Sequence, residues 1–125
     1  MKITVSAEDL KGLDPLPDGK YRATIGKPEF TKANEEGKSD YYAIPFSISE
    51  TPDGAPRRLT RRFSLSPKAM WAWGPLLQAL GLKVEGKAME FDPDELEGGE
   101  VLAIVTQHEH EGRIFNDIKS FAKAK

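Results

Sequence analysis

The sequence predicts a mainly β protein, in which five antiparallel strands form one sheet and a helix is inserted between the third and fourth strands. Five segments have the apolar pattern of β-strands, and they lie at residues 20–30, 41–49, 57–65, 100–107 and 113–121. Most connections are short and contain Gly, Pro or Asp, which favours hairpins and antiparallel pairing. The clearest helical spacing of apolar residues falls between the third and fourth strands.

The composition is that of one globular domain. A chain of 125 residues with 38% hydrophobic and 30% charged residues is long enough to bury a core. No apolar run approaches the roughly 18 residues that a membrane span requires. Cysteine is absent, which excludes disulfides, thiolate zinc sites and cysteine nucleophiles. We expect a single domain over residues 1–125, with an extended lead-in at 1–18 and a frayed basic tail at 122–125.

The second and third strands are expected to form a hairpin. Apolar residues alternate cleanly along the strand at 41–49. Pro45 has no amide proton, so this strand must have an edge or a bulge there. A cluster of Pro, Asp and Gly at 51–56 predicts a turn into the strand at 57–65.

The helix is expected to begin at Ser66 as N-cap with Pro67 as its first residue, and to end at Gly81. Its apolar stripe consists of Met70, Trp73, Leu76, Leu77 and Leu80. The Gly74-Pro75 pair predicts a kink or a split into two pieces. Residues two apart lie on different sides of a helix, so at least one of Trp71 and Trp73 is expected to be partly exposed.

The last third of the chain is expected to complete the sheet. Asp92 caps a short helical turn at 92–96, and Gly98-Gly99 ends it. The strand at 100–107 is apolar on both faces, which predicts a central position. A tight loop at 109–112 leads into the final strand.

This order of elements is the layout of the OB-fold, a partly open five-stranded barrel. In that fold ligands bind on the second and third strands and on two flanking loops. Those loops correspond here to residues 31–39 and 107–112. The net charge is only −2, yet residues 57–68 hold four arginines and one lysine without any acidic residue. The positive segment therefore falls on a strand that this topology assigns to the ligand.

Four sequence runs carry a resemblance to a known family: LPDGKYRATI, FSLSPKAMWAWGPLLQALGL, FDPDELEGGEVLAIV and HEHEGRIFNDIKSF. In this order, over residues 16–121, they resemble small phage and prophage proteins that are predicted to bind single-stranded DNA through an OB-fold. Those proteins belong to phage recombination and replication cassettes. The resemblance implies architecture more than chemistry, because most of the shared residues are caps, turns and core positions, and it carries over no catalytic residue.

Proteins bind single strands with cations that follow the phosphates and with aromatic rings on which bases stack. Alternation places Tyr41 opposite the core face of its strand, and it turns Arg58 and Arg62 outward in the same way. Arg61 points inward on simple alternation, so we expect a bulge or a barrel-edge position there. The candidate nucleic-acid-binding residues are Arg22, Lys32, Lys38, Tyr41, Arg57, Arg58, Arg61, Arg62, Arg113, Phe115 and Lys119.

The final strand offers a second aromatic surface. Phe115 and Phe121 share the parity opposite Ile114 and Ile118, so one face of this strand is expected to stack on bases.

The arginines also have a structural interpretation. Such a run is often a solvated strand face or is paired with acids, and residues 85–100 hold seven acidic residues against one lysine. A tyrosine such as Tyr41 is also more often an ordinary sheet-surface residue than a platform for a base. His108 and His110 are the only histidines, and no third metal ligand is implied by their spacing.

The functional expectation is a non-catalytic protein that binds single-stranded DNA largely without sequence preference and supports phage or prophage replication or recombination. No cofactor, metal or membrane partner is expected. The first residues contain no apolar segment long enough for a secretory signal, so we expect action in the cytoplasm of the host cell. The main alternative is an OB-type interaction module that docks a phage recombinase, nuclease or virion protein. A third reading is a small metal-dependent enzyme centred on His108 and His110.

Overall fold

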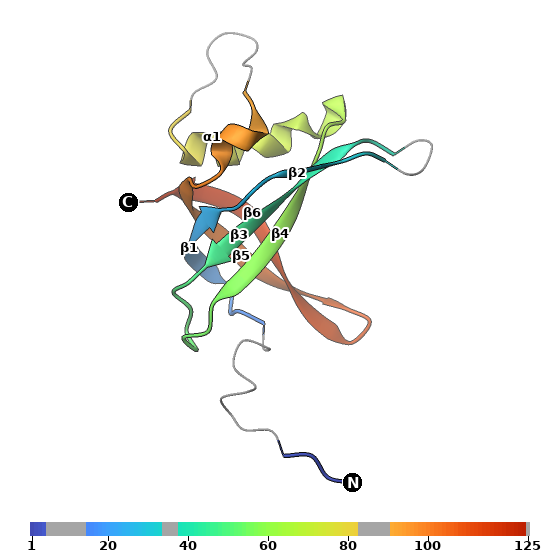
Figure 1. Ribbon diagram of the computed structural model, residues 1–125, viewed down its shortest axis with the longest axis vertical. Helices are drawn as coiled ribbons and strands as arrows, with labels where there is room; N and C mark the ends of the chain where they lie inside the picture. Colours follow the sequence, from blue (N-terminus) through green and yellow to red (C-terminus); the bar gives the residue numbers. More distant parts are fainter. Residues whose placement is uncertain (5–14, 34–37, 83–90, 125) are drawn as a thin grey trace.

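The computed structural model is an open antiparallel β-sheet with one α-helix (Figure 1). It describes residues 1–4, 15–33, 38–82 and 91–124. Most of the expected lead-in, the tip of the loop expected at 31–39, the first residues of the acidic segment and Lys125 lie outside the described residues. Within the described part of the chain, no helix is both long and apolar enough to cross a membrane.

Six strands form the sheet: β1 (Gly19–Ile25), β2 (Glu29–Thr31), β3 (Tyr41–Ile48), β4 (Arg57–Ser64), β5 (Glu100–His110) and β6 (Arg113–Lys123). The hydrogen-bonded order is β2-β3-β1-β5-β6, with β4 paired to β3, and every pair is antiparallel. Strand β5 is paired on both sides, with β1 and β6, so it is an interior strand as its apolar pattern predicts. The rings of Phe63 on β4 and Phe121 on β6 stack with centroids 6.2 Å apart. Among the described residues, however, no backbone pairing joins β4 to β6.

One expected strand, at 20–30, is two strands in the structure. The chain leaves the β1 ladder at Gly26, whose N–H donates to the Pro45 carbonyl at 2.8 Å, and pairing resumes in β2. A Cβ on Gly26 would lie 2.8 Å from Pro45 Cγ, so this approach requires glycine. Pro45 has no N–H to donate, and the ladder beside it is broken between β1 and β2. This break confirms the irregularity predicted at Pro45.

Strands β3 and β4 pair without interruption, from Tyr41 opposite Ser64 to Ile48 opposite Arg57. The bulge expected at Arg61 is therefore wrong, because no residue is inserted in this ladder.

Pro45 directs its carbonyl toward β1, and Leu65 N–H donates to the Asp40 carbonyl at 2.9 Å. In an antiparallel pair, hydrogen-bonded and non-hydrogen-bonded residue pairs alternate. The odd-numbered residues of β4 therefore bond to β3, and the even-numbered ones do not.

The helical segment is split, as Gly74-Pro75 predicts. A 3₁₀-helix, η1 (Pro67–Ala72), is followed by α1 (Trp73–Ala79), which packs on β5 and β6. Ser66 is the N-cap of η1 and Pro67 its first residue, as predicted, although the Ser66 side chain makes no cap hydrogen bond. A second 3₁₀-helix, η2 (Pro93–Leu96), has Asp92 as its cap, and the Asp92 carboxylate accepts from the Asp94 N–H at 3.0 Å.

The core lies between the inner face of the sheet and α1, and it contains aromatic rings from four elements. Trp73 of α1 packs on Phe63 with centroids 4.7 Å apart, and Phe46 packs on Phe121 at 5.0 Å. Trp73 is buried whereas Trp71 is 74% exposed, which confirms that the two tryptophans have different environments. Met70 is exposed, so its place in the predicted apolar stripe is wrong.

A β-bulge in β6 changes which residues face the core. The β5–β6 register shifts between Ile104 and Val105, which pair with Ser120 and Ile118, so Lys119 is the extra residue. Because of this extra residue, Ile118 and Phe121 are both buried although their sequence parities differ. The prediction that Phe121 shares an outward face with Phe115 is therefore wrong. Strand β6 also continues through Lys123, two residues beyond its expected end.

The segment before β1 is bonded to the far end of the sheet. Leu16 is only 1% exposed, and its N–H donates to Asn116 Oδ1 at 2.8 Å. The Leu16 carbonyl accepts from Asn116 Nδ2 and from Gln107 Nε2, each at 2.9 Å. Leu16 is therefore a core residue that side chains of β5 and β6 hold in place.

Replacing Leu16 by alanine tests this assignment. Leu16→Ala removes buried methyl groups and should lower the free energy of unfolding by about 2–5 kcal/mol in chemical denaturation. Ile3 is a matched control because its side chain is exposed, and Ile3→Ala should change stability by less than about 0.5 kcal/mol. Equal effects of the two substitutions would show that Leu16 does not belong to the core.

Candidate nucleic-acid interface

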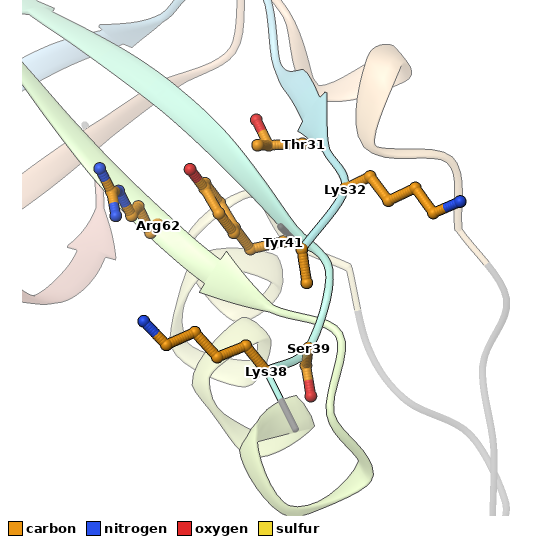
Figure 2. A pocket seen from close by; sticks show the side chains of 7 residues that line it. Thr31, Lys32, Lys38, Ser39, Tyr41 and Arg62 are labelled. Atoms are coloured by element: carbon orange, nitrogen blue, oxygen red, sulfur yellow. The ribbon is translucent and has the colours of Figure 1, made fainter. Parts of the chain in front are cut away.

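A surface pocket of about 310 Å³ lies where β2, β3 and β4 meet (Figure 2). Its lining residues are Thr31, Lys32, Ala33, Lys38, Ser39, Tyr41 and Arg62. Three of these side chains are cationic, and among the described residues that line the pocket none is a carboxylate. The fold therefore brings four residues of the predicted set together at this pocket: Lys32, Lys38, Tyr41 and Arg62.

Tyr41 and Arg62 form the centre of this pocket. The guanidinium carbon of Arg62 lies 5.0 Å from the centroid of the Tyr41 ring, which is cation–π distance. The two residues share one face because Arg62 pairs with Ala43, two residues along β3 from Tyr41. Figure 2 shows Lys38 extending beside them, whereas the Lys32 side chain points away from the ring. The pocket thus presents an aromatic ring together with two nearby cations.

Two hydrogen bonds, one to the side chain and one to the backbone of Asp40, hold the rim of the pocket. Its carboxylate accepts from the Ala33 N–H at 2.9 Å, which ties the strand end after β2 to the start of β3. Its carbonyl accepts from the Leu65 N–H at the end of β4. Asp40 therefore joins all three strands at the point where Tyr41 emerges.

Arg58 extends the same face along β4. It pairs with Ser47, lies at the same parity as Arg62, and is exposed. Within the described residues, neither Arg58 nor Arg62 forms an ion pair with a carboxylate. Arg22 on β1 is also exposed and faces the same side of the sheet, because Thr24, two residues along, pairs with Ser47. Neither Arg22 nor Arg58 lines the pocket.

Arg57 is held by the β3–β4 turn instead. Its Nη2 lies 2.7 Å from Asp53 Oδ2, and its Nη1 donates to the Ala55 carbonyl at 2.7 Å. Its side chain is only 10% exposed. The guanidinium thus stabilises the hairpin turn and lies apart from the pocket.

Arg61 has an inward-facing head at the edge of the sheet. Its guanidinium carbon is 4.9 Å from the Phe63 ring centroid and 5.5 Å from that of Phe121, so it lies between β4 and β6. Burial lowers the pKa of this guanidinium from its usual value, because desolvation disfavours the charged form. Its Nη1 is buried and has no hydrogen-bond acceptor among the described residues. Arg61 thus lies at an edge of the sheet, and the expected bulge is absent.

Arg113, Phe115 and Lys119 lie on β6, away from the pocket. Phe115 is exposed and stacks on His108 of β5, with centroids 5.4 Å apart. His108 Nδ1 also contacts Asp117 Oδ2. Arg113 is exposed at the hairpin end opposite His110. Figure 1 shows this β5–β6 hairpin diverging from β4, so the predicted set divides between two surfaces.

The two histidines do not form the centre of a metal site with the described carboxylates. Among the described residues, no group of three or more His, Asp or Glu side chains could hold a metal ion. His110 lies 3.9 Å from Glu111 at an exposed turn.

Sequence reasoning missed the neutral half of the pocket. Thr31 and Ser39 line it and belong to the flanking loop expected at 31–39, but neither is among the candidate binding residues, since their contribution depends on how the two loop ends close on Asp40. No protein-family model matches this chain, and no curated protein matches it in sequence.

The contrast between neighbouring arginines can be measured. Arg57→Ala removes bonds from a largely buried guanidinium and should lower the free energy of unfolding by about 1–3 kcal/mol. Arg58→Ala changes an exposed side chain and should alter it by less than about 0.5 kcal/mol. Thermal and urea denaturation of both variants would measure this difference. A larger loss of stability in Arg58→Ala than in Arg57→Ala would contradict the assignment of Arg57 to the turn and Arg58 to the surface.

Proposed function

We propose that this protein binds single-stranded DNA, largely without sequence preference, along the outer face of β3 and β4. The observation that carries the proposal is the Tyr41 ring beside the Arg62 guanidinium, in a pocket whose described lining includes lysines and no carboxylate. A base can stack on such a ring, and every base has a face that can do so. Binding through stacking and phosphate contact therefore requires no particular sequence.

The charge distribution supports a path for the backbone. Arg58 and Arg62 are exposed on the same side of β4, four residues apart, with Lys38 at the pocket end. Strand residues rise about 3.3 Å each, so the two residues are about 13 Å apart along β4, and both guanidinium groups can contact phosphates of the same extended strand. Arginine contacts phosphate oxygens with two parallel N–H groups.

The sheet order supports an OB-type barrel as the framework. In this proposal β1 and β2 act as one broken strand, and α1 lies between the third and fourth strands of the barrel. The side-chain contact of Phe63 with Phe121 brings β4 and β6 together at one end without backbone pairing in the described residues. The OB-fold binds oligonucleotides on the strand pair that corresponds here to β3 and β4. The resemblance noted above favours a role in phage or prophage replication or recombination, in the cytoplasm of the host.

A titration with oligo-dT tests the proposal. Binding should be measured by fluorescence anisotropy of a labelled oligonucleotide at two or more salt concentrations, with duplex DNA of the same length as control. We expect preference for the single strand and affinity that falls steeply as salt increases, because bound cations release counterions. Equal affinity for duplex, or no binding at low salt, would refute the proposal.

The double variant Arg58→Ala with Arg62→Ala tests the phosphate contacts. Removing two contacts should reduce the slope of log K against log salt by about 1.4, since each single-strand phosphate contributes about 0.7. The melting temperature should stay nearly unchanged because both side chains are exposed. Lys123→Ala, an exposed change on β6, is the matched control and should leave binding close to that of the unmodified protein.

Tyr41 has a separate test. Tyr41→Ala should cost about 1–3 kcal/mol of binding, the usual value of one stacked base, whereas Tyr41→Phe should retain most of the affinity. Anisotropy titrations at one salt concentration are sufficient. If Tyr41→Phe binds as weakly as Tyr41→Ala, the hydroxyl rather than the ring face carries the contact, and stacking is wrong.

A further inference from the structure

The outer edge of β4 has backbone groups that no strand among the described residues uses. The alternation in the β3–β4 ladder leaves Arg58, Thr60 and Arg62 as the residues whose N–H and C=O point away from β3. All three are exposed, and among the described residues β4 pairs with β3 alone. Toward Arg58 the β5–β6 hairpin diverges from β4 (Figure 1). This edge is therefore open at its Arg58 end, whereas β6 approaches it near Phe63.

We propose that the free edge of β4 binds an extended acidic peptide of a partner protein, which adds to the sheet as a further strand. Unpaired strand edges accept such segments through main-chain hydrogen bonds, while side chains at alternate positions give selectivity. This inference does not depend on the proposed DNA binding.

The charges on β4 select the partner. In an antiparallel pairing of two copies centred on Thr60, Arg58 of each copy would lie opposite Arg62 of the other. Like charges directly opposite one another destabilise a strand pair. A peptide with acidic residues at those two positions would instead place a carboxylate beside each exposed guanidinium. The edge thus disfavours a second copy of this chain and favours an acidic segment.

Arg61 supplies a second, independent observation. Its head lies on the other face of the same edge, and its buried Nη1 has no acceptor among the described residues. Buried donors without partners are costly and are rarely left unsatisfied. The Arg61 head is covered by the rings of Phe63 and Phe121, so it would have to turn outward for Nη1 to donate to a carbonyl of a strand added to β4.

Amide hydrogen exchange tests the edge directly. In the unliganded protein the N–H groups of Leu59, Arg61 and Phe63 should be protected, while those of Arg58, Thr60 and Arg62 should exchange rapidly. The probe is a capped peptide with the core Asp-Val-Thr-Val-Asp. Its addition should slow exchange at Arg58, Thr60 and Arg62 by at least about tenfold. Unchanged exchange at these amides with saturating peptide would overturn the proposal, as would the same protection produced by oligo-dT.

Two N-methylated peptides separate strand addition from simple charge attraction. One carries N-methyl groups on the Asp and Thr residues, and the other carries them on the Val residues. Only one set of amides can face β4, so one peptide should bind at least about tenfold more weakly and the other nearly as well as the parent. A Lys-Val-Thr-Val-Lys peptide should not bind. Equal binding by the two methylated peptides would overturn the proposal.

Thr60→Pro gives the complementary change on the protein. Within the described part of the chain the Thr60 N–H bonds to no strand, so proline should be tolerated there as it is on other edge strands. We expect at least about tenfold weaker peptide binding, while Thr60→Ala should bind as the unmodified chain does. Undiminished binding by Thr60→Pro would contradict the proposal, and the methylated peptides keep the test decisive on the unmodified protein.

Discussion

The uninterrupted pairing of β3 with β4 is the constraint on which the rest of the structure depends. Pro45 directs its carbonyl to Gly26, and this fixes which residues of β4 bond to β3. The same register turns Phe63 and Arg61 toward the core side and Arg58 outward. A slip of one residue would exchange the two faces, exposing a buried phenylalanine and burying arginines. The apolar core and the cationic surface are therefore set by one ladder of hydrogen bonds.

Most of the element order could be predicted because turn residues and apolar alternation are local signals. The split of the helix follows from Gly74-Pro75, and the irregularity opposite Pro45 follows from its missing amide. The break in the first strand was missed, although Gly26 and Pro28 lie within it. Recognising it requires knowing that Gly26 lies against Pro45, and this neighbour relation is tertiary.

For the candidate site too, the sequence predicts only those side-chain directions that follow from local alternation. Alternation predicts the shared outward face of Arg58 and Arg62, because their ladder has no insertion. It fails for Phe121, since the extra residue Lys119 reverses the parity of the remaining strand and no local sequence signal marks that bulge. It also cannot separate the roles of the β4 arginines. Arg57 is engaged by Asp53, a contact that depends on how the turn folds back.

The anchorage of Leu16 has a practical consequence for handling the chain. The Asn116 side chain accepts a hydrogen bond from the Leu16 N–H and donates one to the Leu16 carbonyl, although the two residues are 100 positions apart. The segment just before β1 therefore belongs to the folded unit. Cleavage between Leu16 and Gly19, or a truncation that begins there, would remove the buried Leu16 side chain. Cleavage ahead of Pro15 would spare it. Fragments trimmed to the first strand should consequently be less stable, for a reason unrelated to the strands themselves.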